Sequence, residues 1–346
     1  MTMNLDIDIN TQIARVLAFF SASPIQSVQL ITGGLITSTY RLRTAEGDFC
    51  LQRAHRDIPD AAMEDMHTVT EHLVTRGFCV PQLIRTRDGA LFTHDEDSSR
   101  WRLYRWVQGT VHNVIQDGRA AYQAGKFLGQ LHRTLAELDY HPQGTIPHFH
   151  DTPYIVSKLA GLQGRIPEAV RAMPENTAEG FADDLNILIE KILAEMPRLL
   201  LADDIAGAPQ IIHGDPKAAN LLWDDTGNVI GILDCDTFLW HYPAIDMGDA
   251  LRSWCKHSGH FNLEIYSAAT DGYAKGAERP LTAEHHALYL RATKLITLEL
   301  ACRFLIDVSE DSYFGWDAAQ YPSRRAHNLA RAQQYHRFFT TIPVAV

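Results

Sequence analysis

Short segments in which apolar and polar residues alternate dominate the first third of the chain and predict strands. These segments are 27–31, 40–43, 49–53, 80–87, 90–93 and 100–107. Apolar residues at helical spacing predict a short helix over 11–20 and a longer one over 61–76, with Pro59 before it and Gly77 after it. The pattern therefore predicts an antiparallel sheet with helices packed against it.

Beyond residue 117 the apolar residues follow a helical period instead. The segments with this period are 118–138, 183–201, 285–306 and 324–338. A stretch of short strand-like runs over 209–233 interrupts them. The chain is long enough for two cores, so we predict an α+β fold of two lobes, an antiparallel-sheet N-lobe over 1–108 and a mostly helical C-lobe over 109–346. Gly109 lies at the boundary as a hinge.

The stretch IIHGDPKAANLLWDDTGNVIGILDCD, residues 211–236, carries the strongest chemical pattern. Its strand-like runs predict a hairpin that brings Asp215, Asn220 and Asp234 close together. Phosphoryl transfer uses such a group of side chains. One carboxylate accepts the proton of the attacking hydroxyl, and an amide oxygen with a second carboxylate holds Mg²⁺ against nucleotide phosphates. We therefore predict a kinase site between the two lobes.

The same stretch resembles the catalytic loop of protein kinases, H-R-D-L-x-x-x-N followed by D-F-G. Here it reads His213-Gly214-Asp215, with Asn220 five residues later and then Asp234-Cys235-Asp236. Glycine after the histidine and the final Asp-x-Asp resemble the aminoglycoside phosphotransferase and choline kinase branch. The resemblance implies a protein-kinase-like fold that uses ATP and Mg²⁺. It implies Asp215 and Lys217 as catalytic residues and Asn220, Asp234 and Asp236 as residues of the metal site.

The N-lobe departs from the kinase pattern at the strand that usually carries a phosphate-contacting lysine. Gln52 stands there, and Arg53 is the nearest cation. Either Arg53 replaces the lysine, or backbone amides and the metal do its work. Glu64 and Glu71 are the candidates for its partner on the following helix. The residues that the resemblance places at the nucleotide are Gly33, Gly34, Thr39, Arg53, Trp106 and Gln108.

Further pieces resemble the N-acetylhexosamine 1-kinases of this superfamily. They are Gly33-Gly34-Leu35-Ile36, Leu51-Gln52-Arg53, Arg303-Phe304-Leu305, Tyr313-Phe314 and His327-Asn328-Leu329. This resemblance implies that Arg303 and Tyr313 bind the acceptor and that the acceptor is the anomeric hydroxyl of an N-acetylhexosamine. Leu35 and Thr37 depart from the residues common in those relatives. Other alcohols remain as alternatives, namely an aminoglycoside, homoserine, choline or another sugar, as does a pseudokinase that binds nucleotide without turnover.

Net charge, cysteine spacing and the first residues limit the kinds of partner and the compartment that we expect. The formal net charge of −11 argues against a nucleic acid as the main partner. The five cysteines are scattered and never in C-x-x-C spacing, which is typical of reduced thiols. The acidic first ten residues and the short apolar run at 16–20 do not form a signal peptide or a membrane span. We expect a cytoplasmic protein whose partner is a small molecule, with no membrane partner.

Overall fold

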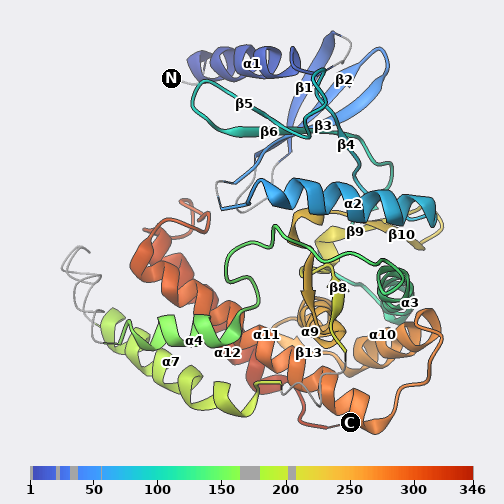
Figure 1. Ribbon diagram of the computed structural model, residues 1–346. Coiled ribbons are helices and arrows are strands. Elements are labelled where there is room, and N and C mark those ends of the chain that lie inside the picture. Colours follow the sequence, from blue (N-terminus) through green and yellow to red (C-terminus); the bar gives the residue numbers. More distant parts are fainter. Residues whose placement is uncertain are drawn as a thin grey trace.

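The computed structural model describes residues 3–20, 24–31, 38–55, 57–163, 180–201 and 208–345. The chain folds into two lobes, with the antiparallel sheet in the upper lobe and helices in most of the lower lobe (Figure 1). The α+β kinase-like fold expected from the sequence is thereby confirmed. Among the described residues, no helix combines the length and the apolar character that a membrane crossing requires.

The N-lobe sheet is antiparallel throughout, in the order β1-β2-β3-β6-β4, with β5 also paired to β6. Its strands are β1 (Ile25–Ile31), β2 (Ser38–Thr44), β3 (Gly47–Arg53), β4 (Leu83–Ile84), β5 (Thr93–His94) and β6 (Arg100–Arg105). β4 and β5 are shorter than the sequence predicts. One reason is that Thr86 forms a bridge with Phe20, and the Arg87 amide donates to the Phe19 carbonyl, so this backbone pairs outside the sheet.

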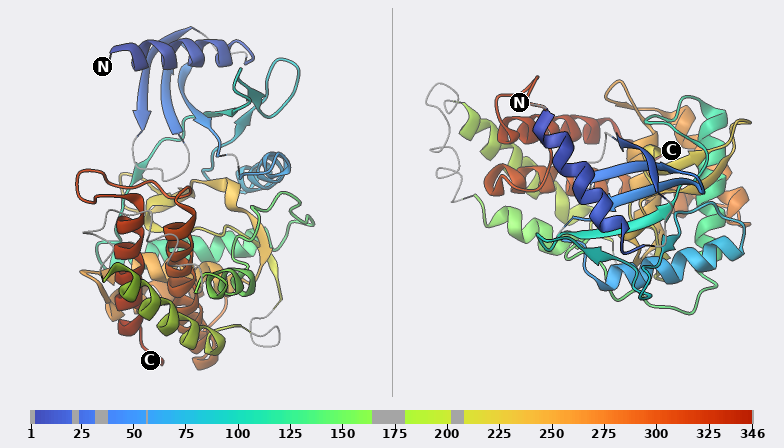
Figure 2. Two further views of the ribbon diagram at one scale, coloured as in Figure 1. Left: turned by 90° about the vertical axis from the view of Figure 1, so that its left-hand side faces the viewer. Right: turned by 90° about the horizontal axis from the view of Figure 1, so that it is seen from above.

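Two helices cover the two faces of this sheet. Helix α1 (Met3–Leu17) lies along one face (Figure 2), where its Ile13 and Val16 belong to one buried cluster with Trp101 and Leu103 of β6. Helix α2 (Ala61–Thr75) lies on the other side and continues into the main core of the C-lobe. The predicted α2 is confirmed, whereas α1 begins eight residues earlier than the pattern at 11–20 indicates.

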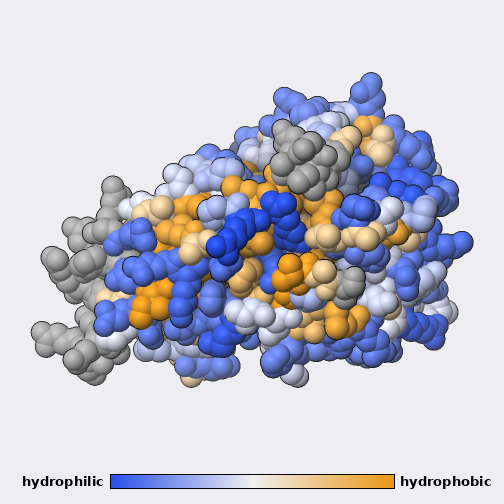
Figure 3. Space-filling view, turned by 90° about the horizontal axis from the view of Figure 1, so that it is seen from below, coloured by the Kyte–Doolittle hydropathy of each residue, from blue (hydrophilic) through white to orange (hydrophobic). Residues whose placement is uncertain are grey.

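The C-lobe is built mostly from helices, and α3 and α10 pack closely together. The helices are α3 (Gly118–Leu135), α4 (Thr152–Ala160), α7 (Phe181–Glu195), α9 (Pro243–Trp254), α10 (Leu263–Gly276), α11 (Ala283–Glu310) and α12 (Arg324–Thr341). A Cβ atom at Gly125 of α3 would lie 1.9 Å from the Ala269 carbonyl oxygen of α10, so glycine permits the close approach. On the face opposite the N-lobe, apolar residues reach the surface in several patches among hydrophilic ones (Figure 3).

A small group of strands joins the lobes. β9 (Leu221–Trp223) and β10 (Val229–Ile232) form the predicted hairpin, while β8 (Gln210–Ile212) pairs with β11 (Leu239–His241). The segment after β6 forms β7 (Thr110–Val111), which pairs with β9. Cys79, between α2 and β4, forms a parallel bridge with Gly231 of β10. The segment after β6 and the segment before β4 are therefore each hydrogen-bonded to the hairpin.

Candidate active site

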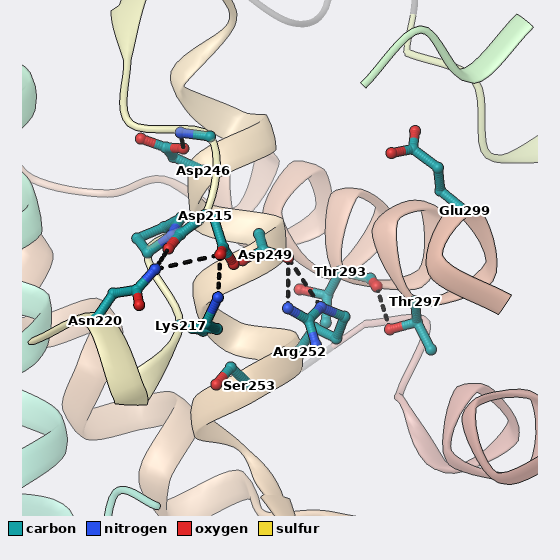
Figure 4. Close-up of polar contacts among 12 residues, drawn as sticks. Asp215, Lys217, Asn220, Asp246, Asp249, Arg252, Ser253, Thr293, Thr297 and Glu299 are labelled. Carbon is teal, nitrogen blue, oxygen red and sulfur yellow. Dashed lines mark hydrogen bonds and ion pairs between the residues drawn. The ribbon is translucent and has the colours of Figure 1, made fainter. Parts of the chain in front are cut away.

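The loop between β8 and β9 brings the two predicted catalytic side chains and one predicted metal-site side chain together (Figure 4). Asn220 Nδ2 donates to the Asp215 carbonyl oxygen at 2.8 Å and to Asp215 Oδ2 at 3.2 Å. Lys217 Nζ forms an ion pair with the same Oδ2 atom. Because these contacts use one oxygen of Asp215 and the amide nitrogen of Asn220, Oδ1 of each residue has no hydrogen bond within the described chain.

Asp234 follows β10 and completes this group. Its backbone is left-handed, with φ 64° and ψ 50°, a conformation that aspartate tolerates better than most residues. Its side chain is 41% exposed, and its Oδ2 lies 3.8 Å from Lys217 Nζ. Burial and the neighbouring Asp236 carboxylate raise the pKa of Asp234 to about 7. Burial opposes protonation of Lys217, but the charges of Asp215 and Asp234 outweigh it and raise the pKa of the lysine.

Asp246 holds the backbone of the catalytic loop. This fully buried carboxylate accepts the backbone amides of His213 at 2.8 Å and Gly214 at 2.6 Å, and it pairs with His132 Nε2 at 3.0 Å. Burial alone would raise the pKa of Asp246, yet the hydrogen bond and charge of His132 lower it. Asp246 lies within the first turn of α9, behind the N-cap residue Tyr242. Its two oxygens therefore hold the backbone of the catalytic loop in place.

Gly214 has a left-handed backbone with φ 87°. A Cβ atom there would lie 2.6 Å from the Thr237 carbonyl oxygen and 2.9 Å from Phe149 Cε1. The glycine that replaces the kinase arginine in the motif is therefore required by both conformation and space.

His150 holds the same loop through the carbonyl oxygen of Gly214. Its Nδ1 lies 2.8 Å from Glu299 Oε1, and its Nε2 lies 2.7 Å from the Gly214 carbonyl oxygen. Both partners can only accept, so both ring nitrogens donate and the ring is an imidazolium. Burial opposes this charge, but Glu299 raises the pKa of His150 to about 9. Sequence reasoning missed this pair because 149 residues separate its members.

We expect the contribution of the His150 charge to stability to depend on pH. A histidine whose pKa rises on folding, from 6.5 to about 9, stabilises the protein fully below pH 6.5 and loses this effect as pH rises through 9. The difference in unfolding free energy between wild type and His150→Gln should therefore shrink by about 3 kcal/mol over that interval. Denaturant unfolding at several pH values measures it. His148→Gln, at an exposed histidine, is the control, and a difference for His150→Gln that stays constant with pH would refute the charge assignment.

Asp249 places another negative charge beside the predicted base. Figure 4 shows it next to Asp215, and the charge of Asp215, after burial, contributes to raising the pKa of Asp249. Its Oδ1 accepts both Nε and Nη2 of Arg252, at 2.9 and 2.6 Å. Its buried Oδ2 has no hydrogen-bond partner. An aspartate and an arginine three residues apart look like an ordinary helical pair in the sequence, which is why this feature was missed.

The two predicted acceptor residues do lie together. Arg303 Nη2 donates to Tyr313 Oη at 3.3 Å, and its guanidinium lies 5.5 Å from the ring centre of Phe149. Phe149 in turn lies against Gly214 of the catalytic loop. Tyr313 also contacts the ring of His55 from the N-lobe, at 5.5 Å between ring centres. Arg303 and Tyr313 therefore border the loop on the helical side.

The residues predicted to bind the nucleotide lie in several different places. Gly33 and Gly34 lie outside the described residues. Thr39 Oγ1 accepts from Gln52 Nε2 at 3.1 Å on one face of the sheet. Arg53 is the register partner of Trp101 and donates to Ser99 Oγ on the α1 side, so the structure does not bring it to the catalytic loop. Alternate residues of a strand face opposite sides, and this geometry separates Arg53 from Gln52.

Trp106 and Gln108 lie in the extended segment between β6 and β7, as the hinge prediction requires. The Trp106 amide donates to the Asp48 carbonyl at 3.0 Å, and Arg41 lies over its ring at 4.3 Å. Gln108 is exposed. Gly109 has φ 147°, and a Cβ atom there would lie 2.6 Å from Leu222 Cγ, so only glycine fits between this segment and the hairpin.

Asp236 pairs with the N-lobe sheet, although its carboxylate also neighbours that of Asp234. It is 6% exposed, and its Oδ2 lies 2.6 Å from Arg102 Nη2 of β6. Burial would raise the pKa of Asp236, but Arg102 lowers it. Glu64 and Glu71, the expected partners of the strand cation, are both exposed on α2. In the described chain, neither glutamate pairs with a cation of the sheet. The carboxylate that pairs with a buried sheet cation, Arg102, is that of Asp236.

The remaining oxygens suit a magnesium ion bound together with a nucleotide. Among the described residues, no group of three or more His, Cys, Asp or Glu side chains is arranged to hold a metal by itself. Mg²⁺ usually takes one or two carboxylates plus phosphates and water, so a closed protein cage is not required. The uncommitted Oδ1 of Asn220 and the half-exposed carboxylate of Asp234 fit that donor set.

A kinase-like fold with this loop and hairpin defines a phosphotransferase. The chain matches the model of the phosphotransferase enzyme family, APH, over residues 27–279, and it belongs to this family. The superfamily expected from the catalytic motif is confirmed. The chain is 28% identical over 338 residues to a homoserine kinase of Rhodopseudomonas palustris (strain BisB18), which covers 96% of this chain and 93% of the relative.

Two solved structures show the same fold at low sequence identity. The microcompartment-associated aminopropanol kinase has a TM-score of 0.64 and 16% identity. The match covers 97% of this chain and 99% of the kinase chain. The amicoumacin kinase hAmiN, in complex with AMP-PNP, Ca²⁺ and Ami, has a TM-score of 0.63 and 14% identity. The match covers 100% of this chain and 98% of the hAmiN chain.

Proposed function

We propose that this phosphotransferase transfers the γ-phosphoryl group of ATP, with Mg²⁺, to the hydroxyl group of a small amino-acid alcohol of the homoserine type. The similarity to a homoserine kinase over 96% of the chain carries this proposal. The grouping of Asp215, Lys217, Asn220 and Asp234 supports the chemistry. An N-acetylhexosamine, the acceptor expected first from the sequence, is not the substrate for which that relative is named. The relative favours homoserine, one of the alternatives.

The free oxygen of Asp215 supplies the base in this proposal. As the acceptor oxygen forms its bond to the γ-phosphorus, the hydroxyl proton passes to Asp215 Oδ1. The bond between the γ-phosphorus and the bridging oxygen of ADP breaks at the same time. Lys217 keeps the carboxylate oriented through Oδ2 and offsets negative charge on the transferring group.

Asn220 and Asp234 would hold Mg²⁺ in this arrangement. The ion supplies charge neutralisation at the nucleotide phosphates. The protein contributes fixed oxygen positions, because the Asp215 carbonyl oxygen holds the amide of Asn220. On the N-lobe side we retain Gly33, Gly34 and Thr39 for the phosphates and the segment with Trp106 and Gln108 for the adenine.

The charge of Arg303 favours an acceptor that carries a carboxylate. Arg303 forms no ion pair within the described chain, although it borders the catalytic loop. A guanidinium in such a place favours a carboxylate of the substrate. A neutral sugar would leave this guanidinium without a charged partner.

An acceptor screen by ADP release tests the proposal. We expect kcat/KM for L-homoserine to exceed that for N-acetylglucosamine, choline and an aminoglycoside. Arg303→Met should lower kcat/KM for homoserine roughly 10- to 100-fold, since a charged hydrogen bond is lost, and should leave the KM for ATP unchanged. A faster reaction with the sugar would overturn the acceptor class. Binding of Mg·ATP without turnover of any acceptor would indicate a pseudokinase.

A further inference from the structure

The N-lobe sheet buries a guanidinium on the face that looks away from α1. Arg102 is 2% exposed and is the register partner of Gln52, the residue that stands where kinases carry a lysine. Its Nε donates to Gln52 Oε1 at 3.0 Å, and its Nη1 lies 3.7 Å from Met63 Sδ of α2. The fixed cation of this face therefore comes from β6 and not from β3.

The partner of this cation comes from the other lobe. Arg102 Nη2 lies 2.6 Å from Asp236 Oδ2, in the turn that begins with Asp234. The resulting chain of contacts runs from Thr39 through Gln52 and Arg102 to Asp236. Among the described residues, one other ion pair joins residues 1–108 to residues 109–346. It is Arg76–Glu137, in which both side chains are exposed.

A buried pair of this kind specifies geometry strongly. If either partner is lost, the other is left as an unpaired charge in a low dielectric. The two donors of Arg102 reach Gln52 and Asp236 at once, which a lysine cannot do from the same position. The position of the sheet therefore determines where the turn with Asp234 and Asp236 lies.

We propose that Arg102 is the positioning residue that couples the N-lobe sheet to the Asp234–Asp236 turn, replacing both the lysine of β3 and the glutamate of α2 that kinases use. The inference rests on the proposed kinase activity for its catalytic consequence. Its structural part concerns the enzyme without nucleotide. Arg102 acts on the reaction through Asp236, which holds the turn that presents Asp234.

Relocating the cation tests the proposal. Arg102→Gln should lower kcat roughly 10²-fold or more, with a raised Mg²⁺ requirement and little change in the KM of the acceptor. Adding Gln52→Lys to Arg102→Gln places a cation on the paired position of β3 and should restore at least about tenfold of the loss. Arg105→Gln, at an exposed arginine of the same strand, is the matched control and should behave as wild type.

Hydrogen exchange of the enzyme without nucleotide separates this inference from the proposed function. Arg102→Gln and Asp236→Asn should each speed exchange at residues 233–238, while β8 and α9 exchange as in wild type. This result would stand even if the acceptor were misassigned. If Arg102→Gln does not fold, Arg102→Lys and Asp236→Asn provide the same measurement. Unchanged exchange at 233–238, a uniform increase over the whole chain, or no rescue by Gln52→Lys would overturn the proposal.

Discussion

Asp215→Asn is expected to lower kcat by roughly 10²- to 10⁴-fold, while affinity for ATP changes little. Asparagine keeps the size of the side chain and its contact with Lys217 through an oxygen, but it cannot accept the hydroxyl proton. Asn220 and Asp234 are unchanged, so the nucleotide should still bind. Steady-state kinetics and direct ADP binding measure the two effects separately.

Asp225→Asn is the control for this variant, because Asp225 is an exposed aspartate in the turn between β9 and β10. It should match wild type in both measurements. If Asp215→Asn left kcat intact and weakened only Mg·ATP binding, Asp215 would be a ligand and not the base.

Asp234→Ala is expected to reduce turnover by roughly 10³-fold or more, because a metal ion supplies several kcal/mol of charge stabilisation in such reactions. The apparent Mg²⁺ requirement should rise in parallel. In buffer with EDTA, however, the melting temperature should stay level or increase. The reason is that burial and the neighbouring Asp236 carboxylate disfavour the charged form of Asp234 more than Lys217, 3.8 Å away, favours it.

Asp236→Ala supplies the contrast two residues away. It leaves the buried Arg102 unpaired and should lower the melting temperature in the same buffer, by an amount that corresponds to about 3–5 kcal/mol. Thermal unfolding and Mg²⁺ titration of the two variants distinguish a ligand from a structural partner. Equal losses of stability in both would contradict the division of roles between the two aspartates.

The sequence was sufficient for the elements and the catalytic loop because both depend on local spacing. The helical period from residue 118 and the alternation before it predicted most of the helices and strands. Asp215, Lys217 and Asn220 lie within six residues, and a single hairpin adds Asp234. A short closed loop leaves few arrangements for these side chains.

Side chains that meet through strand register were not predictable in this way. Arg102 lies beside Gln52 only because β6 pairs with β3 in one particular alignment. The same alternation turns Arg53 toward α1. On α2 the residue that faces the guanidinium is Met63, one position before the expected Glu64, which corresponds to a rotation of about 100° around the helix axis.

Contacts between residues far apart in the sequence were also not predictable around the acceptor site. Arg303 and Tyr313 are close in sequence, and their proximity followed from the motif order. His150 and Glu299 come from an irregular segment and from the middle of a long helix. Neither residue stands in a recognisable pattern, so their contact with the catalytic loop required the structure.

The two backbone attachments between the lobes restrict how the N-lobe can move. Gly109 lies against Leu222 of β9, and Cys79 is bridged to Gly231 of β10, so both attachments lie on one hairpin. The buried Arg102–Asp236 pair and the packing of α2 in the main core add two further contacts between the lobes. The part of the sheet next to the hairpin should therefore move little relative to the C-lobe. β1 and β2, at the end of the sheet away from β6 and β4, should move most, so a change in the width of the site would come from bending of these two strands.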